Sequence, residues 1–540
     1  MIGSSAAWAS RRVLGAGKTP SPSAAAPAPQ SADPASGRAG GAPSEFDIII
    51  VGAGSSGCVL ANRLSANRNL RVLVLEAGGS DADPLIQVPG KWTSLLGSPL
   101  DWNYTTEAVP GLGGRQVKWP RGKGIGGSSS INAMAYVRGH QLCFDTWAAE
   151  SGPMWSYGEL LRRFRRLEDN SRGASDYHGA GGDLAVADTT DPHAGHLAFL
   201  EAARLRGFSA RPDWDFNGAR QENGAGFYQK NIRGGRRHSA AAAFLTPAQS
   251  RPNLTVWPET RALKIVVEGR RVTGVEVLRA GVRQRVRATR EVVLAAGAIE
   301  SPKLLLLSGI GPAEAIKRHG LPVVIDLPGV GANLQDHPRV AVRWAARQPL
   351  AASSVSAGLF TSSSRAASAR PPDLQFYVGR GLDTPDPFVT LTVALSAPAS
   401  RGTVTLRSAD ALAAPQITPN YFAEPADLEA VVEGVLLAQA IGGASPFAAI
   451  RGAAAEPDDR VRTRAELRDY IRRTADTIFH ASGTCRMGAG PTAVVDPQLR
   501  VHGLDGLRVA DGSIMPTVVN SQTHAACVVI GDVAADFIGN

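Results

Sequence analysis

The sequence has few cysteines, no block of basic and aromatic residues, and no long apolar run, and these shortages limit what the protein can be. Only four of its 540 residues are cysteine, and no two of them form a C-x-x-C pair. A zinc site or a disulfide framework is therefore not expected, no other metal site is indicated, and a reducing compartment fits. No apolar run reaches the roughly 20 residues of a membrane-spanning helix. We expect a cytoplasmic protein without a transmembrane segment.

The charge and the N-terminal composition narrow the partners and the location. The formal net charge is +9, but the basic residues are scattered, so nucleic acid is not expected as a partner. The basic surface leaves peripheral association with a membrane open. Residues 1–45 are rich in Ala, Pro, Ser and Gly and predict a disordered tail. Arg11, Arg12 and Lys18 precede any acidic residue, which resembles an organelle transit peptide, so organelle targeting is the alternative location.

What the sequence does contain is a strand–helix–strand unit of the kind that binds a dinucleotide. An apolar strand, Phe46 to Val51, runs into the glycine-rich segment Gly52 to Gly57. A helix follows, and then a second apolar strand, Leu70 to Leu75, which ends in Glu76. Strand, glycines, helix, strand and acid in this order predict a site for the adenine dinucleotide of NAD or FAD.

Each part of this unit has a physical role. Gly52 permits the tight turn out of the strand, Gly54 lets the backbone approach a pyrophosphate, and Gly57 lets the helix pack closely on the sheet. The N-terminus of the helix offers free N–H groups to the phosphates. Glu76 can accept hydrogen bonds from the ribose hydroxyls. The unit alone does not distinguish NAD from FAD.

Two further glycine-rich segments follow along the chain. The segment Arg121 to Asn132 is rich in Gly and Ser, so its backbone can approach a flat or anionic ligand. The apolar run Val292 to Gly297 leads into a predicted helix, Ser301 to Leu307, with Pro302 in its first turn and Gly309 at its end. Three glycine-bounded segments in one chain indicate a single large ligand that several parts of the chain contact.

The remaining pattern mixes strands and helices. Residues 350–372 show no clear period and predict a loop or lid. The other predicted elements are β-strands between about Pro252 and Val277, strands at Leu374 to Val378 and Phe388 to Leu395, and amphipathic helices at Leu428 to Ile441 and Arg464 to Arg473.

Together these motifs resemble the glucose-methanol-choline (GMC) oxidoreductases, a family of FAD enzymes. The resemblance extends from about Phe46 to Ile538, nearly everything outside the N-terminal tail. The later motifs have no role in a generic NAD enzyme, so they favour FAD. The segments that carry the resemblance are Gly122 to Gly139, Gly297 to Gly311, Gly329 to His337, His480 to Gly488 and Gly506 to Ser513.

The resemblance implies an α/β fold with two domains. One is a Rossmann-like FAD-binding domain with a parallel sheet, and the other is an α+β substrate domain with an antiparallel sheet. After the tail, the FAD-binding domain is expected at residues 46–155, 226–340 and 476–540, and the substrate domain at residues 156–225 and 341–475.

The resemblance also implies how FAD would be held. Ala262 would contact adenine through its backbone, and Asp511 and Gly512 would lie near the ribityl chain. Some relatives attach FAD through a histidine, but the matching residue here is Ile131, which predicts non-covalent FAD. The full set expected to contact FAD is Gly52, Gly54, Ser55, Ser56, Gly57, Glu76, Ala77, Arg121, Gly122, Gly126, Gly127, Ser128, Asn132, Ala133, Ala262, Asp511, Gly512, Gln522 and Thr523.

The implied reaction is oxidation of an alcohol to a carbonyl, in which a base takes the hydroxyl proton and a hydride passes to flavin N5. His480 matches the active-site histidine of the family and is the expected base, since its pKa suits proton transfer near neutral pH. The second catalytic position usually carries His or Asn. Here an ungapped match places Gln522 there, and a one-residue bulge would place His524 there instead. A glutamine amide can hydrogen-bond an alkoxide but cannot carry charge.

The other histidines, His140, His337 and His502, are expected to be structural. The segment Gly483 to Gly488 is more similar to bacterial choline and alcohol dehydrogenases than to fungal sugar oxidases. Choline would need an acidic or aromatic cage, and none is evident. A simple primary, aromatic or aliphatic alcohol is therefore favoured, with oxygen or a quinone as electron acceptor. Two alternatives stay open. One is a flavin-dependent fatty-acid photodecarboxylase, which needs a long apolar tunnel and an arginine, and the other is a flavin-binding scaffold that has lost catalysis.

Overall fold

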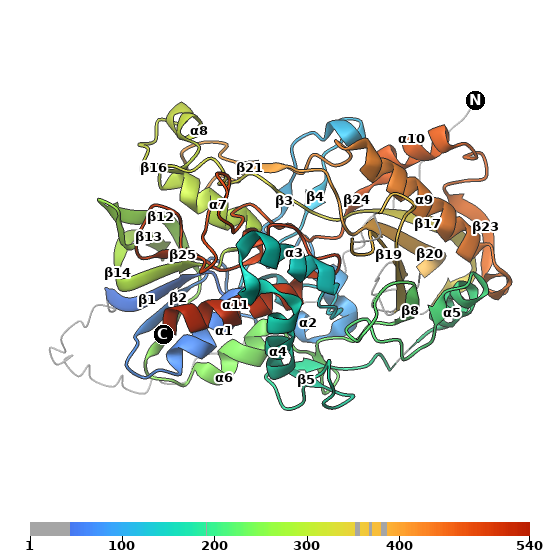
Figure 1. Cartoon of the computed structure of the whole chain (residues 1–540), viewed down its shortest axis with the longest axis horizontal. Helices are drawn as coiled ribbons and strands as arrows, with labels where there is room; N and C mark the ends of the chain where they lie inside the picture. The colour runs from blue at the N-terminus through green and yellow to red at the C-terminus, as the bar shows by residue number, and fades with distance from the viewer. Residues whose placement is uncertain (1–43, 191, 351–356, 367–369, 380–385, 540) are drawn as a thin grey trace, which may run out of the picture. The chain divides into compact units, whose positions relative to one another are not determined.

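One of the two large sheets of the fold is mostly parallel and lies on the left of Figure 1. This computed structural model describes residues 44–539 except 191, 351–356, 367–369 and 380–385. The predicted disordered tail thus lies almost entirely outside the described residues. Around the central strand β1 (Glu45–Val51) the parallel pairs run β11–β2–β1–β14–β25, and β14 also pairs antiparallel with β13, which pairs with β12. The other strands of this sheet are β2 (Val72–Leu75), β11 (Leu254–Trp257), β12 (Thr260–Glu268), β13 (Arg271–Arg279), β14 (Val282–Leu294) and β25 (Leu507–Val509).

Helices cover this sheet, which explains why its strands are apolar on both faces. Ile48, Ile49 and Ile50 are wholly buried, as expected for a strand in the middle of a covered parallel sheet. Helix α1 (Ser55–Ser65) packs beside the C-terminal helix α11 (Thr523–Gly539), and the two lie side by side in Figure 1. The prediction of a strand–helix–strand unit at the start of the chain is confirmed.

Helix α7 (Gly297–Leu307) differs from the prediction at its start. The helix begins at Gly297, so Pro302 lies inside it rather than in its first turn. A proline has no N–H, so the carbonyl of Ala298, four residues earlier, loses its helical partner. The hydroxyl of Thr484 donates to that carbonyl instead, at 2.7 Å. A side chain from a distant motif therefore compensates for the proline.

The second large sheet is mainly antiparallel and lies on the right of Figure 1, with β17 as its longest strand. Its order is β23–β17–β20–β19–β18–β8–β7, and β24 also pairs with β17. The strands are β7 (Ser209–Ala210), β8 (Gly224–Phe227), β17 (Pro338–Leu350), β18 (Ala357–Thr361), β19 (Leu374–Val378), β20 (Asp386–Leu395), β23 (Arg451–Glu456) and β24 (Asp476–Thr477). The helices α5 (Ala194–Leu205), α9 (Pro425–Gly442) and α10 (Arg464–Thr474) pack with this sheet. The predicted fold class is confirmed, whereas the domain boundaries stay a proposal.

The loop predicted for residues 350–372 is wrong in part. Ala357–Thr361 forms strand β18, which is buried between β8 and β19. Its five residues make too short an apolar segment to show a period of two. Residues 351–356 and 367–369 of that prediction lie outside the described residues.

A buried ion network holds together the part of the chain between Arg138 and Asp215. Arg138 and Glu168 have no exposed side-chain surface, and their charged groups lie 2.6 Å apart. His178 contacts Glu168 through Nδ1 and Asp215 through Nε2, each at 2.8 Å. These acidic partners raise the pKa of His178 to about 9 against the opposing effect of burial. The imidazolium is therefore part of the folded structure at neutral pH.

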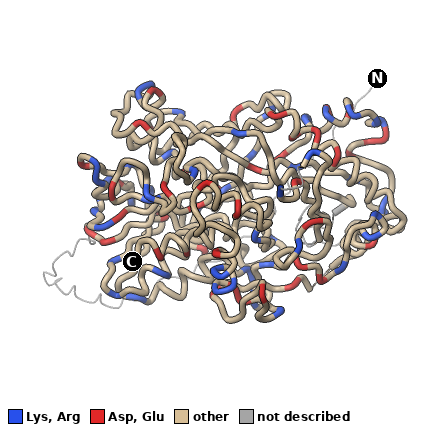
Figure 2. The backbone as a smooth tube through the Cα atoms, in the orientation of Figure 1, with Lys and Arg blue, Asp and Glu red and all other residues tan. Residues whose placement is uncertain are grey.

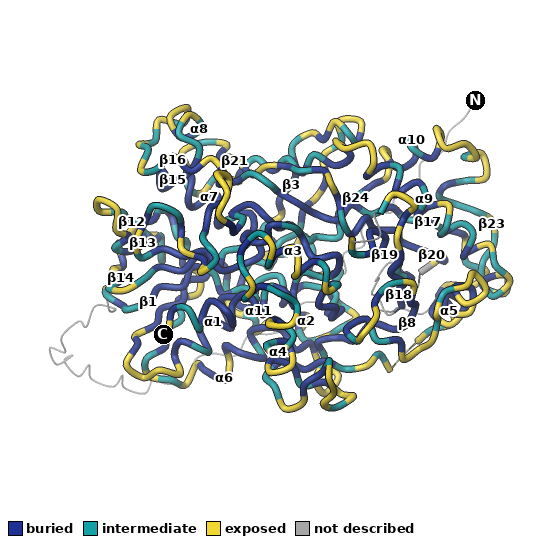
Figure 3. The backbone as a smooth tube through the Cα atoms, in the orientation of Figure 1, coloured by how far each residue is buried: buried dark blue, intermediate teal, exposed yellow. Residues whose placement is uncertain are grey.

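The remaining elements are short or peripheral, and exposed residues gather on loops and on elements at the edge of the molecule such as α5, α8 (Ala313–Arg318) and α10 (Figure 3). Lys and Arg positions are interspersed with Asp and Glu positions along the backbone in Figure 2, and several of these residues form ion pairs three residues apart on a helix. Within the described ranges, no helix is long and apolar enough to cross a membrane. These elements are α2 (Pro84–Gln87), α3 (Gln141–Ser151), α4 (Tyr157–Leu167), α6 (Thr246–Ala248), α8 (Ala313–Arg318), β3 (Tyr104–Thr105), β4 (Lys118–Trp119), β5 (Glu168–Asn170), β6 (Leu184–Val186), β9 (Ile232–Arg233), β10 (Arg236–Arg237), β15 (Ile310–Gly311), β16 (Ile325–Asp326), β21 (Thr403–Thr405) and β22 (Gln416–Thr418).

Candidate active site

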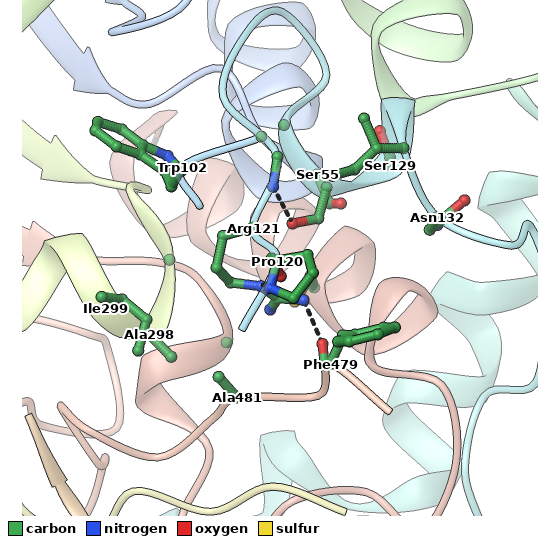
Figure 4. A pocket seen from close by; sticks show the side chains of 18 of the residues that line it. Ser55, Trp102, Pro120, Arg121, Ser129, Asn132, Ala298, Ile299, Phe479 and Ala481 are labelled. Atoms are coloured by element: carbon green, nitrogen blue, oxygen red, sulfur yellow. Dashed lines mark hydrogen bonds between the residues drawn. The ribbon is translucent and has the colours of Figure 1, made fainter. Parts of the chain in front are cut away.

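One cavity of about 490 Å³ is lined by both sheets and by the loops between them (Figure 4). From the first sheet come the turn after β1, the end of β2 and the start of α7. From the second sheet come residues of β17 and β19. The glycine-rich loop near Arg121, the segment around His480 and the residues before α11 complete the wall.

The turn between β1 and α1 requires glycine at two positions. Gly52 has a φ of +106°, and a Cβ there would lie 2.5 Å from the carbonyl oxygen of Ala295. A Cβ on Gly57 would lie 1.9 Å from the carbonyl oxygen of Gly52. Gly57 therefore brings the first turn of α1 against the strand end, and Gly54 and Ser55 are left facing the cavity.

Glu76 lies at the cavity wall, where three loops meet. Its carboxylate accepts backbone N–H groups from Ala53 at 2.9 Å, Gly78 at 2.8 Å and Gly124 at 3.0 Å. Burial raises the pKa of Glu76, and these backbone donors oppose the rise. Glu76 thereby ties the turn after β1 to the loops at Gly78 and Gly124.

Asp511 plays a similar role on the other side of β1. It accepts the N–H of Gly297 and the hydroxyl of Ser301, both at the start of α7, at 2.8 and 2.6 Å. It also accepts the N–H of Ser513 at 2.8 Å. Asp511 thus fixes the C-terminal segment against α7, and both Asp511 and Gly512 line the cavity.

Most of the residues predicted to contact the cofactor line this cavity. The exceptions are Gly57 and Gly126, which shape turns behind the wall. The residues that line it are Gly52, Gly54, Ser55, Ser56, Glu76, Ala77, Arg121, Gly122, Gly127, Ser128, Asn132, Ala133, Ala262, Asp511, Gly512, Gln522 and Thr523, together with the catalytic candidates His480 and His524. Further residues line the cavity that were not among the predicted site residues, namely Trp92, Trp102, Tyr104, Arg261, Glu300, Lys303, Arg339, Arg343 and Tyr377.

The backbone around His480 is held from two sides. Its N–H donates to the buried carboxylate of Asp336 at 2.7 Å, and that carboxylate also accepts the hydroxyls of Thr477 and Tyr421. Phe479 has a φ of +70°, and Arg121 donates to its carbonyl, as Figure 4 shows. These bonds hold a strained turn that presents His480 to the cavity.

His337, which was expected to be structural, lies against His480. Its Nδ1 lies 2.9 Å from Nδ1 of His480, with the two rings nearly perpendicular. Burial lowers the pKa of His337 to about 3. Burial, with smaller effects of His337 and Arg121, also lowers the pKa of His480 well below its ordinary value. Both imidazoles are therefore neutral at pH 7, and no local motif indicated this contact.

The two candidates for the second catalytic position lie differently. Gln522 immediately precedes α11, and its Oε1 is buried with no hydrogen-bond partner among the described residues. His524 lies in the first turn of α11, where its Nδ1 is 2.9 Å from the hydroxyl of Ser55 at the start of α1. Its Nε2 is likewise buried without a partner in the described chain. Burial lowers the pKa of His524 to about 4, so this ring is neutral.

The parallel sheet with its glycine turn, and a neutral histidine in the same cavity, define a nucleotide-dependent oxidoreductase of Rossmann type. Family models described as GMC oxidoreductase match residues 46–339 and 398–531. The alcohol dehydrogenase (acceptor) of Pseudomonas putida is 40% identical, over 91% of this chain and 95% of its own. The mitochondrial choline dehydrogenase of Homo sapiens is 39% identical, over 92% and 90%. Pyridoxine 4-oxidase from Mesorbium loti superposes with a TM-score of 0.86 at 35% identity, over 91% and 98%.

The chain belongs to the GMC oxidoreductase family, as its motifs predicted. The family match covers the strands and loops that supply most of the cavity wall. It does not reach residues 340–397, which include most of β17 and all of β18 to β20.

Proposed function

We propose that this chain is an FAD-dependent alcohol dehydrogenase in which His480 is the base and Gln522 the second catalytic residue. The observation that carries the proposal is a neutral imidazole held by Asp336 and His337 at the wall of the cavity that the dinucleotide turn also lines. When bound, FAD accepts the hydride from the alcohol carbon. The protein supplies the base, the orientation of the substrate and the exclusion of water.

The residues present fit a bound FAD. The turn Gly52–Gly57 and the N-terminus of α1 form a cradle for a pyrophosphate, since a Cβ on Gly127 would come within 2.8 Å of the Gly54 Cα. The orphaned Nε2 of His524 is a buried polar atom beside that helix start, and a ligand atom would satisfy it. Ile131 lines the cavity and has no nucleophilic atom, which supports non-covalent attachment.

The histidine pair allows a tautomer of His480 that suits a base. Two neutral imidazoles that meet through Nδ1 must share one proton, so one ring donates and the other accepts. If His480 donates its Nδ1 hydrogen to His337, its Nε2 keeps a lone pair that can take the hydroxyl proton. The imidazolium then formed keeps His337 as an acceptor, so the positive charge is stabilised where it develops.

Gln522 is favoured over His524 for the second position. His524 is engaged with Ser55 at the start of α1, the end of the cavity that suits phosphate. Gln522 has an unpartnered amide oxygen, and its amide N–H₂ can donate to the substrate oxygen. Arg121, held at the carbonyl of Phe479, adds positive potential beside the position of the developing alkoxide.

The alternatives have less support. The relatives reported above are named as alcohol and choline dehydrogenases, which gives a photodecarboxylase no support. A scaffold without catalysis gives no reason for the bonds that hold His480. The choice between oxygen and a quinone as acceptor, the cytoplasmic location and peripheral membrane association stay predictions.

The direct test is anaerobic mixing of the flavin-loaded protein with primary alcohols while the yellow flavin band is followed. Bleaching is expected, and His480→Ala should slow it by roughly 10²–10⁴-fold with the flavin still bound. The matched control is His319→Ala, since His319 ends α8 and is not part of the cavity wall. A clear flavin spectrum that no alcohol bleaches would favour the scaffold alternative.

A further inference from the structure

Strand β17 presents a polar face to the cavity and an apolar face to the helices. Val340, Val342 and Trp344 are buried in the core that includes residues of α9. The alternate residues Arg339 and Arg343 line the cavity. Successive side chains of a strand point to opposite faces. The alternation that turns the valines into the core therefore turns the two arginines toward the cavity.

The neighbouring strands continue this polar face. In the register of the sheet, Arg343 lies opposite Thr390 of β20, and Thr392 of β20 lies opposite Tyr377 of β19. Tyr377 lines the cavity with the arginines. The wall contributed by the second sheet is therefore rich in hydrogen-bond donors.

The carboxylates that balance these arginines stand away from the cavity wall. Arg339 pairs with Asp476 at 2.8 Å, and Arg343 pairs with Glu456. Neither Asp476 nor Glu456 lines the cavity. A molecule inside the cavity meets the guanidinium groups first and the carboxylates behind them.

The carboxylates that do line the cavity belong to the first sheet and its connections. Among the described residues these are Glu76, Glu300 and Asp511. Glu76 and Asp511 accept backbone N–H groups, as described above. Glu300 accepts the hydroxyl of Tyr104 at 2.5 Å and pairs with Arg261 at 3.2 Å. None of them offers an uncompensated charge to a cationic substrate.

Four buried polar atoms on the strands of the second sheet have no partner among the described residues, and two of them belong to residues on neighbouring strands β17 and β20. These two are Nε of Arg343 and Oγ1 of Thr390, the residues that face each other in the register. A buried polar group left unpaired is costly, so each such group calls for a partner such as a ligand. An arginine Nε donates only, so the ligand atom expected beside it is an acceptor.

We propose that this wall selects an alcohol that carries a carboxylate, an ω-hydroxy acid, and disfavours the quaternary ammonium of choline. The proposal rests on the proposed function, since it names the substrate class of the same cavity. The hydroxyl lies at His480, and the carboxylate lies along β17 at the donors of Arg343, with Arg339 between the two. A cation there faces two guanidinium groups without a nearby free carboxylate.

The test compares three alcohols with the flavin-loaded enzyme: choline, its uncharged carbon analogue, and ω-hydroxy carboxylates of a series of chain lengths. The expected order of kcat/KM for flavin reduction is hydroxy acid, then neutral alcohol, then choline. Arg343→Met should lower kcat/KM for the hydroxy acid by on the order of tenfold more than it lowers kcat/KM for the neutral alcohol. Turnover of choline as fast as its carbon analogue overturns the proposal.

The matched control is Arg347→Met. Arg347 lies on the same strand but is exposed and donates to the carbonyls of Ala448 and Arg451, so its loss should affect all three alcohols equally and little. An Arg343→Met effect that is the same for all three alcohols also overturns the proposal. Arg343→Lys should recover part of the preference, since it keeps the charge but loses Nε.

A binding measurement separates this proposal from the proposed function. Pentanoate has the carboxylate but no hydroxyl, so it can bind and cannot be oxidised. It should raise the Tm of the flavin-loaded parent protein, and that shift should be lost in Arg343→Met and kept in Arg347→Met. If no alcohol bleaches the flavin, the proposed alcohol oxidation is refuted. The Tm shift with pentanoate decides the anion site separately: a shift supports the site, and the absence of a shift refutes it.

Discussion

The contact between His337 and His480 predicts that His337 controls the rate without touching the substrate. Replacing His337 by leucine removes the atom 2.9 Å from Nδ1 of His480 and leaves that nitrogen without its partner. His337 has no exposed surface, so water cannot readily take its place. His480 would then lose both the bond that sets its tautomer and the acceptor for its positive charge.

The size of the effect follows from the charge state that matters. A hydrogen bond to a charged group contributes about 1.5–3 kcal/mol, and the imidazolium of His480 exists only after proton transfer. At about 1.36 kcal/mol per factor of ten, the rate of flavin reduction should fall by roughly 10- to 150-fold. Substrate affinity should change little, because the alcohol binds to the neutral ring.

The pH dependence gives a second observable. The pKa of His480 lies well below its ordinary value, chiefly because of burial, so the base is neutral at pH 7. The rate should be flat near neutrality and fall only as the pH drops through that low pKa.

The assay is stopped-flow reduction of the flavin over a range of pH, with the flavin content of each variant measured first. His337→Gln should recover most of the rate, since its amide oxygen can accept the Nδ1 hydrogen. His502→Leu is the matched control, because His502 contacts the carbonyl of Gly488 and does not line the cavity. A His337→Leu enzyme that reduces its flavin at the parental rate would refute the reasoning.

Further predictions concern the glycine turn and the buried ion network. Gly57→Ala should abolish stable flavin binding, since its Cβ would meet a backbone oxygen at 1.9 Å; the ratio of flavin to protein absorbance measures this. Gly158→Ala in α4 meets no atom within 4 Å and should keep the flavin and leave the Tm equal or slightly higher. The folded pKa of His178 is about 9 against an ordinary 6.5, so its contribution of about 3 kcal/mol should be complete below pH 6.5 and be lost as the pH rises through about 9. Thermal unfolding from pH 6 to 10 should show this loss in the parent and much less of it in His178→Gln, and equal slopes would contradict the assignment.

The elements of the fold that are determined by local sequence patterns could be predicted. The turn at Gly52–Gly57, the apolar strands beside it and the helices at Pro425–Gly442 and Arg464–Thr474 all have local signals of period or turn chemistry. The prediction that most cofactor-binding candidates lie near one another depended on the family resemblance rather than on such signals. The roles that the resemblance implies for individual residues stay predictions.

The parts that depend on distant contacts were not predictable in the same way. His337 meets His480 across 143 residues of chain, and Thr484 completes the helix around Pro302 from a different motif. Neither contact leaves a local pattern. The arginines of β17 are an intermediate case, because the alternation of valine with arginine does predict a half-buried strand, but not that its polar side faces a cavity rather than solvent.

The position of Asp336 and His337 has a consequence for how such enzymes can diversify. The two residues directly precede β17, and the strand that leads to His480, β24, pairs with the start of β17. The proposed base is thus anchored to the second sheet, which carries the proposed substrate-binding wall, while the glycine turn after β1 belongs to the first sheet. A chimaera that exchanged the second sheet between two relatives would therefore exchange the proposed base as well. Only chimaeras that move residues 336–350 and 476–480 together should keep His480 aligned with the rest of the site.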